Sequence, residues 1–362
     1  MFTTKITAYQ NTSMLILSSF IYQIMLLPLL IESTKGPTAW ISVLAAAGVA
    51  IMFTKPIIKL QSNHPSKTLL DICAEFMPKF MVKLIGAFYI AFFILAGSML
   101  LKDFSEQVKM FMLFRTPNNL IILIILITSS YATQKGINTI AQVAHITVII
   151  ALIPLIFVTI FSTAYSNFSN IFPIFPPDVK GIIKGIPYAA VGFFGFTIML
   201  FSNPYVRDHK KNLGENRKFL IVSSLIQVLC FFLVIFKFGQ VEAKRLMWPF
   251  VSILKFLNLP GAFLENTEAV GISLNIVCAF VCLSIILYFT NLSLQKTLRT
   301  SDNGYFIFIQ TPIIYILACL LPGMNIVIRY IKIPVYIFLT VNALIILLLI
   351  VADRKRSKAN ET

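Results

Sequence analysis

The sequence predicts an all-α polytopic membrane protein with ten transmembrane helices. Its composition supports a membrane location, because 58% of the 362 residues are hydrophobic and only 12% are charged, whereas about 25% of residues in soluble proteins are charged. Its hydropathy pattern supports the helix count, since ten apolar runs approach the roughly 20 residues needed to cross about 30 Å of hydrocarbon. The connections are short, so we expect one transmembrane domain over residues 1–362.

The ten predicted spans follow one another along the whole chain. The first apolar run is too long for the core of a signal peptide and lacks a clear cleavage site, so we expect it to remain as the first span. The spans cover residues 12–31, 38–55, 84–102, 119–134, 140–161, 185–204, 219–239, 271–294, 304–321 and 333–352.

The charges of the connecting segments predict the orientation. With both termini in the cytoplasm, the inner segments carry 18 of the 30 Lys and Arg residues, as the positive-inside rule favours. The net charge of +16 is spread over short clusters between apolar runs, which is typical of contact with an anionic lipid bilayer rather than with nucleic acid. Residues 353–362 are predicted to form a basic cytoplasmic tail.

Ten spans divide into two halves of five, residues 12–161 and 185–352. Because five is odd, the second half must cross the membrane in the opposite sense to the first. The longest inner connection, 56–83, follows the second span, and the longest outer connection, 240–270, follows the seventh. This correspondence indicates an inverted repeat, an architecture in which substrates bind at the midplane between discontinuous helices.

The sixth span carries the clearest signs of interruption. The segment 185–206 contains Pro187, Gly192, Gly195 and Pro204. Backbone groups freed by helix breakers within a membrane must face protein, water or a ligand, so a break here predicts a binding site. The alternative is that the glycines let neighbouring helices pack closely.

The first span is also predicted to be discontinuous. It combines Ser18, Ser19, Tyr22 and Gln23 near mid-depth with Pro28, which removes a helical hydrogen bond. We expect this polar cluster to face the interior of the bundle. The alternative is that the serines bond to their own helix and that Gln23 joins two helices.

Little in the sequence points to catalysis. Asp and Glu are absent from the middle of every predicted span, and the motifs for metal, nucleotide or acyl-enzyme chemistry are also absent, so we expect no catalytic residue, metal or cofactor. His145 is the best intramembrane titratable group, although a hydrogen-bonded structural role is favoured for it.

A pocket between the first and sixth spans is the predicted binding site. Ends of broken helices attract carboxylates and ammonium groups, which suits an amino-acid-sized zwitterion. The predicted ligand-binding residues are Tyr22, Gln23, Met25, Phe193, Gly195 and Thr197, with Ser98 and Ser284 from the third and eighth spans.

The chain resembles the permease-like B subunits of spore germinant receptors, within the amino acid–polyamine–organocation transporter superfamily. The resemblance extends over nearly the whole chain and depends on the order and spacing of several stretches. These are Pro28 with Gly36, Pro37, Ala39, Trp40 and Ile41; Thr68, Leu69 and Leu70; Tyr89, Phe92 and Phe93; Gly195, Phe196 and Pro204; Trp248, Pro249, Phe263, Leu264 and Glu265; and Leu321 with Pro322.

The resemblance implies a LeuT-like fold, a nutrient site between helices 1 and 6, and assembly with A and C subunits in the inner membrane of a spore. Two departures affect the pocket. The chain has Ile21, Tyr22 and Gln23 where the family tends to have a glycine-containing break, and Thr197 where many members have an acid. These departures imply either a ligand that differs from a simple amino acid or weak binding.

Three functional hypotheses follow. In the first, the chain recognises a nutrient and signals to partner subunits. In the second, it is a secondary active amino acid transporter, which would accumulate labelled amino acids in proteoliposomes. In the third, it is a scaffold with a vestigial pocket, and only changes in the outer connection around Trp248 would disturb assembly.

Overall fold

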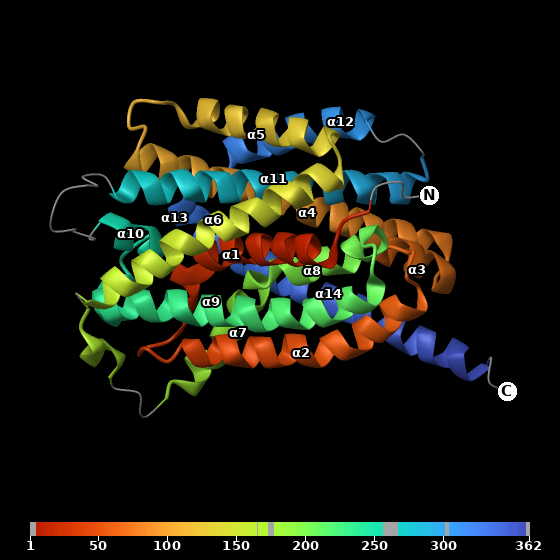
Figure 1. The fold of residues 1–362 in the computed structure, drawn as a ribbon, viewed down its shortest axis with the longest axis horizontal. Coiled ribbons are helices and arrows are strands. Elements are labelled where there is room, and N and C mark those ends of the chain that lie inside the picture. The colour runs from red at the N-terminus through yellow and green to blue at the C-terminus, as the bar shows by residue number, and fades with distance from the viewer. Residues whose placement is uncertain (1–4, 165, 173–176, 256–266, 301–303, 360–362) are drawn as a thin grey trace.

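The computed structural model describes the chain except residues 1–4, 165, 173–176, 256–266, 301–303 and 360–362. The described residues form a bundle of helices (Figure 1). Its elements are α1 (Ala8–Ser33), α2 (Trp40–Asn63), α3 (Leu69–Phe76), α4 (Lys79–Phe111), α5 (Asn118–Gln134), α6 (Ile137–Ala164), η1 (Phe168–Ile171), α7 (Val179–Gly192), α8 (Phe194–Ser202), η2 (Asn203–Tyr205), α9 (His209–Ala243), α10 (Pro249–Lys255), α11 (Thr267–Leu298), α12 (Tyr305–Leu320), α13 (Met324–Tyr330) and α14 (Lys332–Ala359).

The helices confirm a polytopic membrane protein. Among the described residues, eight spans are long and apolar enough to cross a membrane, and the pair α12 and α13, bent by 101°, gives a ninth. The predicted span 119–134 coincides with α5, whose 17 residues extend about 26 Å, less than the roughly 30 Å of a hydrocarbon core. A total of ten crossings therefore stays a prediction.

The two ends of the bundle differ in what covers them. Helix α1 begins and α14 ends at the same end, where α3 also lies, whereas α10 and α13 lie at the opposite end (Figure 1). Helix α3 of the predicted inner connection 56–83 and helix α10 of the predicted outer connection 240–270 thus lie at opposite ends. Phe263, Leu264 and Glu265 fall outside the described residues.

The predicted discontinuity of the first span is wrong. Helix α1 is continuous from Ala8 to Ser33 with Pro28 inside it. The Ser18 hydroxyl donates to the carbonyls of Met14 (2.7 Å) and Leu15 (3.1 Å) of its own helix, so this polar side chain needs no unwound backbone. Helix α1 also packs against α6, α7, α8, α9 and α11 in the middle of the bundle, and a proline is tolerated within a membrane helix that other helices surround.

The predicted interruption of the sixth span is present. Helix α7 ends at Gly192, helix α8 begins at Phe194, and Phe193 between them has φ −83° and ψ 44°. The end of this span is bound to the residues just before α1, because the backbone N–H of Ile6 donates to the carbonyl of Tyr205 over 2.8 Å. The broken span is therefore held alongside the continuous α1.

Candidate functional site: the junction of α1 with the broken sixth span

The break in the sixth span is a local tightening of the helix. The N–H of Phe193 donates to the carbonyl of Ala190 (3.1 Å), and the N–H of Phe196 donates to the carbonyl of Phe193 (2.8 Å). Both bonds join residues three apart, as in a 3-10 turn, rather than four apart. Such a turn changes the direction of backbone groups within a buried span.

Helix α1 packs closely on the first turn of α8. The N–H of Gly195 donates to the Ser19 hydroxyl over 2.9 Å, and the ring of Tyr22 stacks on that of Phe194 with centroids 4.2 Å apart and planes 18° apart. A Cβ on Gly195 would press on the Leu15 carbonyl oxygen, so only glycine permits this approach. We call the region formed by Ser19, Tyr22, Gln23, residues 192–195 and Gln227 the α1–α8 junction.

Two buried amide side chains flank the break on the side of α9. The Gln23 Nε2 donates to the carbonyl oxygen (3.1 Å) and the hydroxyl (2.7 Å) of Ser223. Because a carbonyl can only accept, these bonds fix the orientation of the amide and leave the Gln23 Oε1 atom without a donor among the described residues. The Oε1 atom of Gln227, one turn along α9, is equally without a donor.

Both amides meet at Gly192. A Cβ built on Gly192 would lie 2.8 Å from Gln227 Nε2 and 3.2 Å from Gln23 Cγ, so the two side chains approach the same point on the broken helix. Each side chain is 2% exposed, and a buried acceptor without a donor is costly in a protein interior. The junction therefore contains unused capacity to accept hydrogen bonds.

The stacked rings of Tyr22 and Phe194 also form part of the wall of an apolar cavity of about 320 Å³. Its volume is near the lower bound of the roughly 300–1,000 Å³ that is usual for small-molecule sites. The side chains around it come from five helices and the α13–α14 connection: Tyr22, Met25, Leu26, Phe88, Ala91, Phe92, Leu95, Ala96, Met99, Val191, Phe194, Ile331, Pro334, Val335, Ile337 and Phe338. We call it the aromatic cavity.

Five of the predicted site residues lie at the α1–α8 junction or at the aromatic cavity. Tyr22 and Met25 line the aromatic cavity, Gln23 faces α9, and Gly195 touches α1. Phe193 forms the break itself. These five residues lie in one region, where α1 meets the broken sixth span.

The other predicted residues lie elsewhere. Thr197 is buried in α8 and is not among the residues that line the aromatic cavity. Ser98 donates to the carbonyls of Ile94 (2.8 Å) and Ile314 (3.4 Å), which places it between α4 and α12. Ser284 donates to the carbonyl of Phe280 in its own helix α11.

Sequence reasoning missed a buried carboxylate. Helix α4 continues to Phe111, well beyond the predicted end of the third span at 102, so Asp103 lies inside a helix and is 4% exposed. Its Oδ1 atom accepts from the Trp248 indole N–H (2.8 Å) and its Oδ2 atom from the Gln107 amide (2.7 Å). Gln107 in turn accepts from the Asn275 amide over 2.9 Å.

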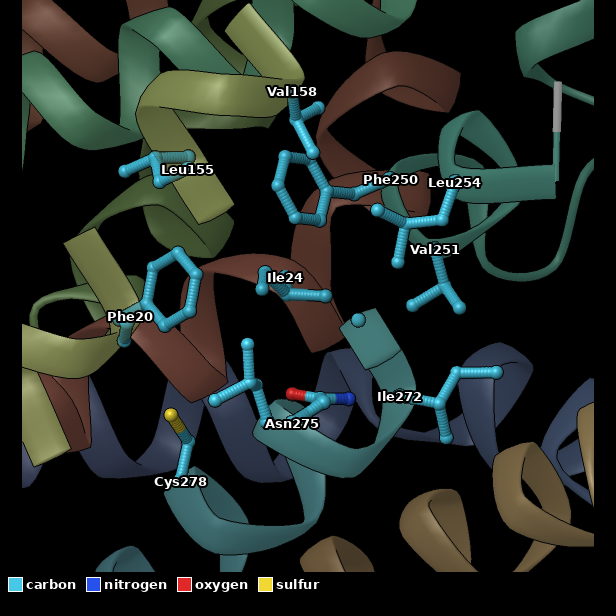
Figure 2. A pocket seen from close by; sticks show the side chains of 13 residues that line it. Phe20, Ile24, Leu155, Val158, Phe250, Val251, Leu254, Ile272, Asn275 and Cys278 are labelled. Atoms are coloured by element: carbon cyan, nitrogen blue, oxygen red, sulfur yellow. The ribbon is translucent and has the colours of Figure 1, made fainter. Parts of the chain in front are cut away.

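This polar chain borders a second, much smaller cavity under α10. The cavity has a volume of about 50 Å³, and Phe20 of α1 and Phe250 of α10 meet edge to face beside it with centroids 6.3 Å apart. Figure 2 shows the labelled side chains around it, with the amide of Asn275 among them. Asp103 therefore connects α4 both to the segment before α10 and, through Gln107 and Asn275, to α11.

His145 is within hydrogen-bond distance of a neighbouring helix, as the structural interpretation of this residue predicts. Its Nδ1 atom lies 2.9 Å from the Ser13 hydroxyl of α1. The contact joins α6 to the first turns of α1, away from the break.

Comparison with known proteins decides the family. The profile of a family described as spore germination protein matches residues 5–327. The chain belongs to this family. It is similar to spore germination protein YndE of Bacillus subtilis (strain 168), with 24% identity over 98% of this chain and 99% of that protein. It is also similar to spore germination protein A2 of the same organism, with 24% identity over 79% of this chain and 78% of that protein, and to spore germination protein B2, with 22% identity over 73% and 72%.

Proposed function

We propose that the chain is the nutrient-recognition subunit of a spore germinant receptor, which binds an amino acid or similar small molecule and signals to A and C subunits. The family match supports a role in germination and favours it over the alternative of a secondary active transporter. The proposal places the protein in the inner membrane of the spore with both termini in the cytoplasm. It also takes α5 as the tenth crossing, and an even number agrees with the start of α1 and the end of α14 lying at the same end of the bundle.

The unpaired amide oxygens at the broken sixth span are the observation that carries this proposal. An ammonium group has three donors and no acceptor, so Gln23 Oε1 and Gln227 Oε1 offer partners of the right kind. The N–H groups at the start of α8 would suit a carboxylate once the Gly195 N–H parts from the Ser19 hydroxyl. The two ends of a zwitterion therefore find complementary groups at the α1–α8 junction.

In this conformation the junction is closed by side chains. Tyr22 lies on Phe194, and the glycines at 192 and 195 let α1 and α9 approach the break directly. Binding of a nutrient would thus require α1 and α8 to separate. A ligand that binds only the separated state shifts the population toward it, and this shift is the signal that we propose partner subunits detect.

Replacing each glutamine by leucine tests the site. We expect Gln23→Leu and Gln227→Leu to weaken nutrient binding at least about tenfold, since hydrogen bonds to charged groups contribute about 1.5–3 kcal/mol. The measurement is the shift in thermal unfolding of the purified chain when the standard L-amino acids are added one at a time, together with germination of spores that carry each variant.

Gln310→Leu is the matched control. Gln310 is also buried, donates from Nε2 to a backbone carbonyl (Leu287, 3.0 Å) and has an Oε1 atom without a described donor, but it lies on α12, away from the break. Its variant should keep the nutrient response. Equal loss in all three variants, or full response in the first two, would refute this site. Uptake by proteoliposomes that contain only this chain would point instead to transport.

A further inference from the structure

The aromatic cavity has walls that offer almost nothing to a polar guest. Of its lining residues only Tyr22 carries a nitrogen or oxygen atom in its side chain, a single hydroxyl that is buried without a hydrogen-bond partner among the described residues. Apolar cavities of this kind stay dry, because a water molecule needs two to four polar partners. A zwitterionic nutrient would leave both charges unpaired there, which is more costly still. The lining therefore suits a hydrocarbon occupant.

The cavity reaches the outer surface of the bundle between α4 and α14. Two of its lining residues, Ala91 of α4 and Ile337 of α14, are exposed. The neighbouring outward positions are large and apolar, with Leu84 62% exposed and Ile333 63% exposed. Exposed apolar faces of membrane-spanning helices are in contact with lipid, so the mouth of the cavity opens into the bilayer.

Stacked aromatic rings and one hydrogen bond keep the cavity from collapsing. Phe338 of α14 lies on Phe92 of α4 with centroids 3.7 Å apart and planes 8° apart, and Phe92 stacks in turn on Phe194 at 5.7 Å. Nearby, the Tyr89 hydroxyl donates to Asn342 Oδ1 over 2.9 Å. The distance between α4 and α14 is thus fixed by rigid contacts, and the space between them persists.

We propose that the aromatic cavity holds one acyl chain of a bilayer phospholipid, inserted between α4 and α14. The surrounding medium supplies this occupant at high concentration, and a flexible chain fills an irregular space that no water stabilises. The inner end of the chain would lie against Phe194, whose ring also stacks on Tyr22 of the α1–α8 junction. This inference does not depend on the proposed nutrient site.

Photolabelling tests the proposal. The full chain is reconstituted in vesicles of phosphatidylethanolamine and phosphatidylglycerol that contain a trace of phosphatidylglycerol with a diazirine near the end of one acyl chain. After irradiation, peptides are mapped by mass spectrometry. We expect label on inward-facing residues of the cavity, such as Met25 and Met99, in addition to the outward-facing Leu84.

Variants distinguish occupancy from surface labelling. Ala96→Phe fills the cavity from its 7% exposed wall position and should lower the label on Met25 and Met99 several-fold. Ala87→Phe, the same change at an exposed position of the same helix, should leave it unchanged. If Ala96→Phe fails to fold, Leu95→Trp fills the cavity from its half-buried rim.

Two results would overturn the proposal. One is label confined to outward-facing residues, or label on Met25 and Met99 that filling the cavity does not change. The other is a loss of label from these residues when L-leucine is added, because the occupant would then be a nutrient side chain. Neither readout involves germination, so failure here is separate from failure of the proposed nutrient site.

Discussion

The N–H of Gly195 donates to the Ser19 hydroxyl over 2.9 Å, and this bond joins the first turn of α8 to the middle of α1. The contact exists because Gly195 has no side chain between the two helices. The same position therefore sets both the stability of the α1–α8 junction and the ease with which the two helices separate.

Gly195→Ala should destabilise the protein by about 1–3 kcal/mol, the usual cost of overpacking a core, because the new methyl group presses on the Leu15 carbonyl. Thermal unfolding of the purified chain measures the loss. Gly214→Ala is the control, since no atom lies within 4 Å of its added Cβ and alanine favours a helix by up to about 1 kcal/mol. Equal stability of Gly195→Ala and wild type would show that α1 and α8 are not in close contact.

The sequence predicted the break in the sixth span but not the continuity of the first. At the sixth span several helix breakers coincide, and the structure uses Gly192 and Gly195 for close contacts. The first span has a single proline. Whether a proline breaks a membrane helix depends on the helices packed around it, and the periodicity of the sequence does not show these helices. The polar residues there follow the simpler alternative, with Ser18 bonded to its own helix and Gln23 to α9.

The aromatic cavity could not have been predicted for a related reason. Its rings come from segments far apart in the chain, such as Phe92 and Phe338, and an apolar pattern shows that a residue is buried without showing its partner. Gln227 did carry a usable signal, since it is an amide within the seventh predicted span, as Gln23 is within the first. Asp103 was missed because helix α4 continues to Phe111, past the end of the apolar run at residue 102.

Trp248→Phe should destabilise the end of the bundle that α10 covers. The change removes the indole N–H that Asp103 Oδ1 accepts and leaves a buried carboxylate oxygen without its donor, at a cost of about 1–3 kcal/mol. We expect faster hydrogen exchange in residues 249–255 and a lower unfolding temperature. Asp103→Leu combined with Trp248→Phe should lose less than the sum of the single losses, because the two side chains are in contact.

Trp40→Phe is the control for the loss of an indole. The Trp40 Nε1 atom is buried without an acceptor among the described residues, so its removal leaves no new unpaired group. Its variant should keep the exchange pattern of residues 249–255. Additive losses in the Asp103 and Trp248 pair would show that their hydrogen bond contributes little.

Cys73 should be unreactive in the folded protein. Burial in α3 raises the pKa of its thiol to about 12, so almost none is thiolate at pH 8. In a variant that keeps only this cysteine, we expect a maleimide to label it slowly until the protein is denatured. Ala74→Cys, which places a thiol at an exposed position of the same helix, should be labelled at once. Rapid labelling of Cys73 would mean that α3 does not pack as described.

Asp178 should make the stability of the protein depend on acid pH. The backbone N–H groups of Gly181 and Lys35 donate to its carboxylate and hold its pKa below the usual value, which joins the start of α7 to the α1–α2 connection. A lowered folded-state pKa gives a stabilisation that is present above about pH 3.9, the unfolded value, and is lost as the pH falls through the folded value. The unfolding temperature should therefore drop below about pH 4, and the drop should be less steep in Asp178→Asn than in wild type. Glu242→Gln is the control, because the Glu242 carboxylate pairs with Arg245 on the surface, and it should behave as wild type. Parallel pH profiles for all three proteins would exclude this role for Asp178.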